Sequence, residues 1–342
     1  MNGLFKGLLS IDSYLLSEQV KNLLEIFSDI KKEINCVEKE LRNVVRDADP
    51  LIKETSIHLI NAGGKRLRPA LSFLGGKFYN YNYKEVLPLA VALELTHMAT
   101  LVHDDVVDSS LTRRNIPTVK AMCGNKISTH LGDYLFGKSL KLIARYDSAV
   151  IAGVVADTSV KMCIGEIQQL SSSNKINQTV RDYFYRIKRK TALLIAASSH
   201  LGAVVCGAPP SIQKPLKKYG HCIGMAFQIT DDILDLVADQ EELGKPVGSD
   251  LRQGIVTLPL IYALKHSPER DRLAKIVLRE DKSDGDVNDA CRLVISCGGV
   301  DYANKVAQRF ICRAREELTL LPDIPARASL SAVAEFVNAR RY

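Results

Sequence analysis

Apolar residues recur at helical spacing along most of the chain. Those between Val37 and Val45, for example, repeat every three or four residues and would share one face of a helix. A helix should end near Gly63-Gly64, a new one should begin near Pro69, and the helical pattern should break at Asn80–Asn82 and at Pro209-Pro210. Alternating strand patterns are scarce, so the pattern predicts an all-α fold of about ten to fifteen helices.

Two stretches are apolar nearly all round, Leu89–Val102 and Ile223–Ile229, and each runs into an aspartate-rich pentad of the form DDxxD. The pentads are Asp104–Asp108 and Asp231–Asp235. A single pentad is weak evidence, because acidic pairs at helical spacing are more often a solvated face or a cap. Aspartates that continue a buried helix, however, should line a cavity.

The spacing of the pentads favours a metal site. On a helix, residues i and i+4 share one face, so each pentad can present two carboxylates to one point. Crowded carboxylates are costly to desolvate without a cation. Magnesium takes carboxylate oxygens and shares its coordination shell with phosphate. Two facing pentads therefore predict a cage for a diphosphate, in a deep central cavity of the helical bundle.

No Gly/Ser-rich or Pro-rich linker divides the chain, so residues 1–342 are predicted to form one domain. The polar stretches Ser171–Thr179 and Glu280–Asn288 are interpreted as surface loops. The charge-free stretch Thr191–Gln213 is broken by polar residues and prolines, which favours a core helix over a membrane span.

The net charge of +7 would suit an anionic substrate, an acidic membrane surface or nucleic acid. No nucleic-acid partner is expected, since the basic residues are scattered and no aromatic-basic module is present. The eight cysteines lack metal-ligand spacing and are interpreted as small buried residues of a reducing cytosol. Met1–Ser17 lacks the features of a secretory signal. We therefore expect a cytoplasmic protein, with at most peripheral membrane contact during product release.

Basic residues indicate a second anion site. GGKRLRP spans Gly63–Pro69, and Arg113-Arg114 follows the first pentad. Arginine forks hold phosphate oxygens at two points, and glycines let the backbone approach an anion closely. Alone, GGKRxRP is equally consistent with a helix start that carries surface charge. Beside two acidic clusters it predicts a diphosphate pocket that uses no metal.

Two diphosphates held by different means imply two substrates with different fates. A metal-bound diphosphate is poised to leave, because the cation neutralises the charge that develops on the departing oxygen. Its loss would leave an allylic carbocation. A double bond on the second, salt-bridged molecule could attack that cation.

These motifs resemble those of the all-trans polyprenyl diphosphate synthases, within the isoprenyl diphosphate synthase family, and in particular those of bacterial heptaprenyl synthase large subunits. The resemblance is specific from about Gly63 to Pro259 and looser at both ends. The matching stretches are GGKRLRP from Gly63, HMATLVHDDVVD from His97, RR at Arg113, GEIQQ from Gly165, KTA from Lys190, FQITDDILD from Phe227, LGKPVGSDL from Leu243 and TLP from Thr257.

The resemblance implies a helical bundle, usually dimeric, that adds isopentenyl diphosphate head to tail onto an allylic primer such as farnesyl or geranylgeranyl diphosphate. It also implies a set of site residues. The residues that hold about two to three magnesium ions and the allylic diphosphate are Asp104, Asp105, Asp108, Asp231, Asp232 and Asp235. The residues that contact the same diphosphate are Arg113, Lys190 and Lys245. The residues that bind isopentenyl diphosphate are Lys65, Arg68, His97 and Arg114.

The remaining roles concern the cation itself. The resemblance places Thr191 and Gln228 beside the allylic cation, where their dipoles can stabilise positive charge. No protein base is obvious, and the resemblance implies that the released diphosphate removes the proton. His97 is also consistent with a core histidine. Asn115 and Ile255 occupy places where many relatives carry glycine and a basic residue, which bears on loop shape and minor phosphate contacts.

Ala99 lies five residues before Asp104, where short-chain relatives place a bulky aromatic floor. The first pentad also lacks the two-residue insertion of many bacterial short-chain relatives. One helical turn rises about 5 Å, roughly one isoprene unit. An open floor therefore predicts a long product of about six to nine units (about C30 to C45), such as heptaprenyl or octaprenyl diphosphate for a quinone side chain.

Several alternatives stay open. The protein could be a short-chain farnesyl or geranylgeranyl diphosphate synthase, with Ala99 small only for packing. It could be a large subunit that is active only with an unlike small subunit. A noncatalytic subunit is disfavoured because all six aspartates are present. A class I terpene cyclase is disfavoured by the GGKRxRP pocket and by the second DDxxD.

Overall fold

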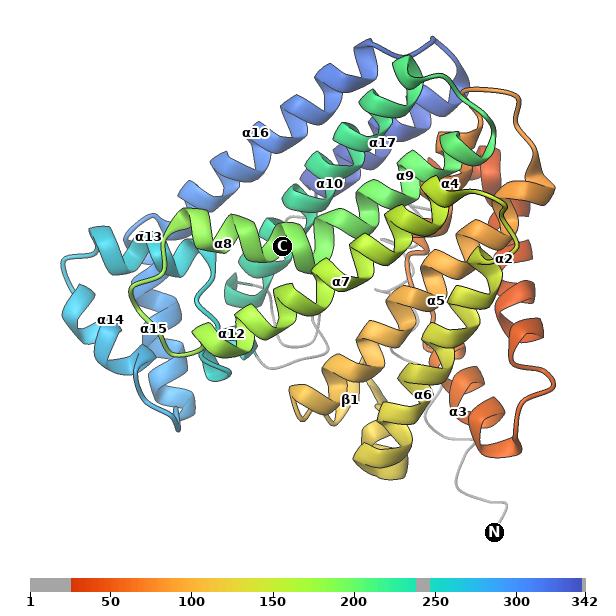
Figure 1. The fold of residues 1–342 in the computed structure, drawn as a ribbon. Coiled ribbons are helices and arrows are strands. Elements are labelled where there is room, and N and C mark those ends of the chain that lie inside the picture. Colours follow the sequence, from red (N-terminus) through yellow and green to blue (C-terminus); the bar gives the residue numbers. More distant parts are fainter. Residues whose placement is uncertain (1–25, 238–246, 340–342) are drawn as a thin grey trace.

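Helices form almost every element of this computed structural model (Figure 1), which describes residues 26–237 and 247–339. Within these ranges there are fifteen α-helices, so the all-α prediction is confirmed. Met1–Ser17, on which the absence of a signal was predicted, lies outside the described residues.

The first half of the chain begins with a 3₁₀ turn at Ser28–Ile30. The α-helices that follow are α2 (Lys31–Val44), α3 (Pro50–Asn61), α4 (Leu67–Gly76), α5 (Tyr83–Val107), α6 (Val119–Ile143), α7 (Ala149–Ser172), α8 (Val180–Ile187) and α9 (Leu193–Val205). A π-helical turn at Lys188–Ala192 joins α8 to α9. The second half contains α10 (Pro210–Val237), α12 (Ser249–Arg252), α13 (Leu258–His266), α14 (Arg270–Val277), α15 (Asp284–Ser296), α16 (Gly299–Thr319) and α17 (Pro325–Ala339).

Long helices pack side by side around α5 and α10, which carry the two pentads. Helix α5 packs against α6 and α4, and α10 packs against α9 and α16. Figure 1 shows α13, α14 and α15 gathered at one end of this bundle. One hydrophobic cluster joins α2, α4, α5 and the C-terminal helices, and a second joins α8 and α10 to α13–α16. The pentads thus extend from rigid, buried helices.

Polar caps set the helix ends where turn residues predicted them. Helix α5 begins after Asn82, whose side chain accepts a hydrogen bond from the Lys84 amide, and α10 begins at Pro210. The predicted loop at Glu280–Asn288 is partly wrong, because α15 already starts at Asp284. Ser283 and Asp286 form a capping box there, with each side chain bonded to the other residue's amide.

A short β-hairpin was not predicted. It pairs Thr112–Arg113 with Ile116–Pro117. Its two turn residues, Arg114 and Asn115, both have positive φ, at 52° and 61°. A two-residue hairpin turn of this kind requires left-handed backbone, which asparagine tolerates better than most residues. This explains how Asn115 can stand where relatives carry glycine.

Helix α5 is long and apolar enough to span a membrane, yet 67% of its most apolar window is buried inside the protein. It is therefore the core helix that its all-round apolar sequence predicted. Helix α9, within the charge-free stretch, is likewise buried along most of its length.

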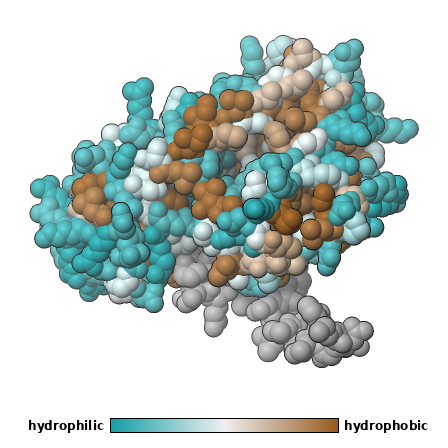
Figure 2. All heavy atoms as spheres, turned by 60° about the horizontal axis from the view of Figure 1, so that its bottom comes forward, coloured by the Kyte–Doolittle hydropathy of each residue, from teal (hydrophilic) through white to brown (hydrophobic). Residues whose placement is uncertain are grey.

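Helix α7 carries an apolar outer face. Val150, Val160, Ile164 and Ile167 are 38–64% exposed, and among the fully exposed residues of this helix only Asp157 is charged. The space-filling view in Figure 2 likewise shows hydrophobic side chains gathered in a band across the molecule, with hydrophilic residues on both sides. A contiguous apolar face of this kind marks an interaction surface more often than a free surface.

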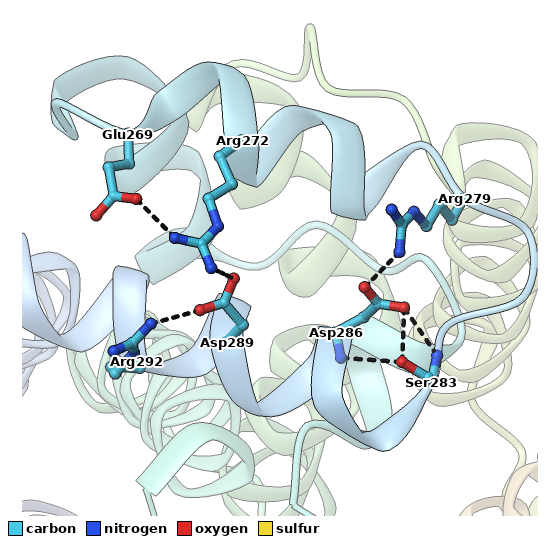
Figure 3. A network of polar contacts seen from close by, with 7 residues as sticks. All are labelled: Glu269, Arg272, Arg279, Ser283, Asp286, Asp289 and Arg292. Carbon is cyan, nitrogen blue, oxygen red and sulfur yellow. Dashed lines mark hydrogen bonds and ion pairs between the residues drawn. The ribbon is translucent and has the colours of Figure 1, made fainter.

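Helices α14 and α15 are tied by a surface network of ion pairs (Figure 3). Arg272 bridges Glu269 at 3.0 Å and Asp289 at 2.7 Å, and Arg292 also pairs with Asp289 at 2.6 Å. Nearby, Arg279 pairs with Asp286 of the capping box. None of these residues lines the cavity described below. Exposed ion pairs of this kind contribute little to stability. The network links α14 to α15, outside the cavity.

Candidate active site

The two pentads meet at one cavity of about 250 Å³. Asp104 and Asp108 reach it from the end of α5, and Asp231 and Asp232 reach it from α10. The apolar stretches before each pentad are buried, so the carboxylates emerge together at the helix surfaces that face the cavity. The remaining lining residues are Arg113, Gln169, Arg186, Ile187, Lys190, Gln228, Ser249, Asp250, Gln253, Ile255 and Thr257.

The other two pentad aspartates bond to the protein itself. Asp105 is 3% exposed and accepts hydrogen bonds from Arg113, with Nε at 2.9 Å and the nearer terminal nitrogen at 2.8 Å. Asp235 accepts from the amides of Ser249 and Asp250 at 3.1 and 3.0 Å, and so fixes the start of α12. Asp105 thereby orients the arginine hairpin, and Asp235 anchors a loop that lines the cavity.

Within residues 26–237 and 247–339, no three Asp, Glu, His or Cys side chains converge closely enough to form a complete metal site. A cation here would therefore need ligands from outside the protein, such as water or phosphate oxygens.

Burial raises the free energy of the ionised aspartates in this cavity. The pKa of Asp104 is raised to about 6, mainly by burial and also by the nearby Glu166 and Asp108 carboxylates, while Lys190 lowers it. Burial also raises the pKa of Asp232 to about 7, with Asp250 adding like charge. Among the described residues, five carboxylates line the cavity against only three cationic side chains, Arg113, Arg186 and Lys190. The residues present therefore fit a divalent cation.

The π-helical turn presents Lys190 and Thr191 to the site. A π turn is wider than an α turn and is found mostly at functional sites. Two glycines let neighbouring helices approach it. A Cβ on Gly165 of α7 would lie 2.8 Å from Arg189 Cβ, and one on Gly224 of α10 would lie 2.5 Å from Ala192 Cα. Tight packing on both sides therefore holds the turn in place.

Lys190 and Thr191 each have a partner. The Lys190 ammonium lies 2.8 Å from Glu166 of α7 and also interacts with Asp104. The Thr191 hydroxyl donates to Gln228 Oε1 at 2.6 Å, and Gln228 Nε2 donates to Asp232 Oδ1 at 2.8 Å. The structure thus brings the Thr191–Gln228 pair to the edge of the acidic cavity.

Basic residues form a second cluster, named the basic pocket, around Gly63, Gly64, Arg68 and Arg114. An Arg114 terminal nitrogen donates to the Gly63 carbonyl, and a Cβ on Gly64 would lie 2.9 Å from this guanidinium. Glycine is therefore required at 64, where φ is +152°. The Arg68 Nε is buried without a hydrogen-bond partner in the described part of the chain. This pocket offers donors to an anion.

The cations of this pocket suppress one another's charge. Burial, together with repulsion from Arg114, lowers the pKa of Arg68 to about 10. Burial and the surrounding arginines, Arg68 first among them, lower the pKa of His97 well below its usual value, so His97 is neutral near pH 7. The pocket adjoins the acidic cavity, because the Asp231 carboxylate also acts on Arg68. Lys65 lies over the Phe227 and Phe336 rings, 5.9 and 5.2 Å from their centroids.

Arg66, between these residues in sequence, has a different role. It is 6% exposed, has φ of 45°, and pairs with Glu38 and with Glu94 at 2.8 Å. Glu94 comes from the middle of α5 and is itself 3% exposed. Arg66 therefore locks the GGKRLRP turn to α5 and is unavailable to a ligand.

Several residues of the site were not predicted from the sequence. Glu166 holds Lys190, Arg186 donates to the Val256 carbonyl at 2.6 Å, and Asp250 lines the cavity. Glu94 could have been identified, because a lone carboxylate in an apolar helix requires a buried cation. Lys245 lies outside the described residues.

Ala99 is 2% exposed and belongs to the hydrophobic cluster that includes Met98, Val102 and Leu131 of α6. It lies on the α5 segment that leads to Asp104. Hydrophobic side chains therefore surround the position that was predicted to leave a tunnel open, and the tunnel itself stays a prediction.

Comparisons with known proteins agree with this geometry. The family model for polyprenyl synthetase matches residues 49–294. Heptaprenyl diphosphate synthase component 2 of Geobacillus stearothermophilus is 41% identical over 94% of this chain and 99% of its own. The protein of the same name from Bacillus subtilis is 39% identical over 92% and 90%. Polyprenyl synthase from Caulobacter crescentus, crystallised with calcium and isoprenyl diphosphate, superposes with a TM-score of 0.89 at 32% identity, over 94% of this chain and 98% of its own.

Proposed function

The chain belongs to the polyprenyl synthetase family and is a prenyltransferase that makes prenyl diphosphates, and from this premise we propose how its residues act and how long its product is. The observation that supports the assignment of residues is the convergence of Asp104, Asp108, Asp231 and Asp232 on one cavity, next to a separate basic pocket. We propose that the allylic diphosphate binds in the cavity and isopentenyl diphosphate in the basic pocket.

The donor set of the cavity suits magnesium, because all its candidate ligands are carboxylate oxygens. Asp104, Asp108 and Asp231 would hold the ions, about two to three in number, with substrate oxygens completing the shell. When bound, these ions neutralise the charge that develops on the departing diphosphate. The calcium in the Caulobacter polyprenyl synthase supports a divalent cation here.

The chain's own residues position the reacting groups. Arg113 and Lys190 line the cavity and would bind the allylic diphosphate, each held ready by a carboxylate, Asp105 or Glu166. Lys245 would join them. The hydroxyl of Thr191 and the amide of Gln228 would face the positive charge that develops at the allylic carbon. The departing diphosphate would accept the proton that completes the reaction.

The acceptor would be anchored without metal. Arg68, Arg114 and Lys65 supply positive charge, and His97 supplies a neutral hydrogen-bonding ring. We place the isopentenyl double bond within reach of the allylic carbon, and the charge interaction between Asp231 and Arg68 supports this placement. This proximity is what head-to-tail condensation requires.

We propose a product of about six to nine isoprene units. The small side chain at Ala99 supports this length, as do the two relatives named heptaprenyl diphosphate synthase component 2. The product would serve as a quinone side chain, and the enzyme would be cytoplasmic. A bulkier residue deeper along α5 would set the final length.

We propose that the outer face of α7 binds a second subunit. The helix has 24 residues, or about 36 Å, enough to anchor the roughly 800 Å² that each partner buries in a stable interface. A second copy of this chain suits a face with so few charges. The relatives named component 2 support the alternative, an unlike small subunit.

One experiment tests these proposals together. The purified chain is incubated with magnesium, isopentenyl diphosphate and farnesyl diphosphate, and the products are sized by mass spectrometry. Products of about C30 to C45 are expected. Products no longer than C20 would overturn the length proposal. No product from the chain alone, followed by product when host extract is added, would favour the unlike-subunit alternative over the homodimer.

A further inference from the structure

Tyr183 of α8 reaches the acidic cavity from behind. It is 0% exposed, and its hydroxyl donates to Asp232 Oδ2 at 2.7 Å. A tyrosine phenol is protonated near pH 7, so this hydroxyl is a hydrogen-bond donor to the carboxylate. No other polar contact of the Tyr183 hydroxyl is found among the described residues.

Asp232 connects this phenol to the reacting end of the site. Its other oxygen, Oδ1, accepts from Gln228 Nε2 at 2.8 Å. Asp232 therefore accepts on both oxygens, from Tyr183 and from the amide nitrogen of Gln228. The carbonyl oxygen of Gln228 must then face the other way, toward Thr191, whose hydroxyl donates to it at 2.6 Å.

A series of hydrogen bonds therefore connects Tyr183 through Asp232 and Gln228 to Thr191. Each donor in this series has a defined acceptor, so the series orients the Gln228 amide and the Thr191 hydroxyl. Gln228 lines the cavity, and its carbonyl oxygen is held toward the Thr191 hydroxyl. A Gln228 amide that was free to flip would present its NH₂ group there about as often, which would repel a cation.

We propose that Tyr183 is a positioning residue for prenyl transfer, which holds Asp232 so that the Gln228 carbonyl and the Thr191 oxygen face the developing carbocation. This inference rests on the proposed placement of Thr191 and Gln228 beside that cation. It gives Asp232 a second role besides any contact with metal. Tyr183 touches no substrate and acts only through Asp232.

The test uses two diphosphate analogues of equal shape. One carries a protonated amine where positive charge develops, and the other carries a neutral carbon at the same place. Their dissociation constants are measured by calorimetry with magnesium present. The ratio of the two constants reports how well the site favours positive charge, and general effects on folding or diphosphate binding cancel in it.

Tyr183→Phe removes only the hydroxyl. We expect it to reduce the preference for the charged analogue by about 10-fold, while affinity for the neutral analogue and the magnesium concentration for half-activation stay unchanged. The matched control is Tyr219→Phe on α10. Tyr219 is also 0% exposed, and its hydroxyl donates to the Leu330 carbonyl at 2.7 Å, away from the cavity. The control should lose comparable thermal stability and keep the full preference.

Three results would overturn the inference. Tyr183→Phe could keep the wild-type preference, it could weaken both analogues equally, or its defect could be cured by more magnesium. If Tyr183→Phe does not fold, Asp232→Asn tests the same link, since it must also lower the preference. A wild-type protein with no preference for the charged analogue would instead refute the proposed cation site, and the inference with it.

Discussion

The acidic cavity and the basic pocket lie side by side, yet they carry opposite electrostatic costs. In the cavity, burial raises the pKa of Asp104 to about 6 and that of Asp232 to about 7, and in the described part of the chain five carboxylates line it against three cationic side chains. In the pocket, burial and mutual repulsion lower the pKa of Arg68 to about 10 and lower that of Arg114. One region therefore lacks positive charge, and the other lacks negative charge.

The difference shows how one site can treat two diphosphates differently. A diphosphate in the basic pocket relieves repulsion directly and gains by staying bound. A diphosphate in the acidic cavity can bind only with cations that also stabilise it after departure. In the proposed assignment, the charge of each pocket would distinguish the substrate that ionises from the substrate that is anchored.

The test with the largest expected effect removes a carboxylate from the acidic cavity. Asp104→Asn keeps the shape and removes one charge, and we expect kcat to fall by about 1000-fold, because a cation would lose a ligand where negative charge develops. Initial rates at saturating substrate measure this. Asp323→Asn is the control, since Asp323 is an exposed aspartate paired with Arg327. A fall of less than about tenfold would contradict the role of Asp104.

The second test removes an arginine from the basic pocket. Arg68→Gln should raise KM for isopentenyl diphosphate by about 100-fold and change KM for the allylic substrate little, because a charged hydrogen bond to an anchored group is worth about 1.5–3 kcal/mol. Steady-state kinetics with each substrate varied in turn measures the split. Equal changes in both KM values would contradict two separate pockets.

Arg66→Gln is the matched comparison, two residues away. Arg66 pairs with buried Glu94, so its loss should lower the free energy of unfolding by about 3 kcal/mol and leave an uncompensated carboxylate in α5. Denaturant unfolding measures this. We expect the folded fraction of this variant to keep its KM for isopentenyl diphosphate. A raised KM with unchanged stability would mean that Arg66 is a ligand.

Sequence patterns were sufficient for the parts of this site that depend on local geometry. The i, i+4 spacing within each pentad and the buried helix before it predicted that Asp104 and Asp108 would face the same cavity as Asp231. Turn residues predicted the end of α3 and the gaps before α5 and α10, because such residues act within a few positions. The basic motif was identified by residue type, since arginine and glycine each have a distinct use around phosphate.

Contacts between distant segments were beyond these patterns. Nothing near Asp105 or Asp235 indicates that one would bind the hairpin arginine and the other the amides of α12. The π-helical turn depends on Gly165 and Gly224, which lie on two other helices. Tyr183 is 49 residues from Asp232 in the chain. Such contacts arise only when tertiary packing brings separate helices together.

A third test compares the two regions through pH. Asp104 and Asp232 bind protons more tightly in the fold than in the unfolded chain, where their pKa is near 3.9. Their contribution to stability is therefore full below about pH 4 and is lost as pH rises through about 6 to 7. His97 has a lowered pKa, so its contribution is present above about pH 6.5 and is lost as pH falls.

Thermal unfolding of the metal-free protein measures both trends. Between about pH 4 and pH 7, Asp104→Asn should gain stability relative to wild type by on the order of 2 kcal/mol, and magnesium with a diphosphate should erase the gain. His97→Gln should show the opposite trend, gaining relative to wild type as pH falls. Parallel pH profiles for all three proteins would contradict the charge imbalance proposed for each region.

The smallest expected effect on rate comes from a substitution at Ala99 of α5. Ala99→Phe adds a ring on the α5 segment before Asp104, and we expect shorter products with initial rates within about threefold of wild type, since no charged group changes. A ring inserted into this hydrophobic cluster should also cost about 1–3 kcal/mol of stability.

Ala90→Phe, at another fully buried α5 position nine residues earlier, is the packing control and should destabilise the protein without the same shortening. Radiolabelled elongation products separated by length measure the outcome. Unchanged product length in a folded Ala99→Phe protein would mean that the growing chain takes another path, and that Ala99 is small only because α5 and α6 pack closely.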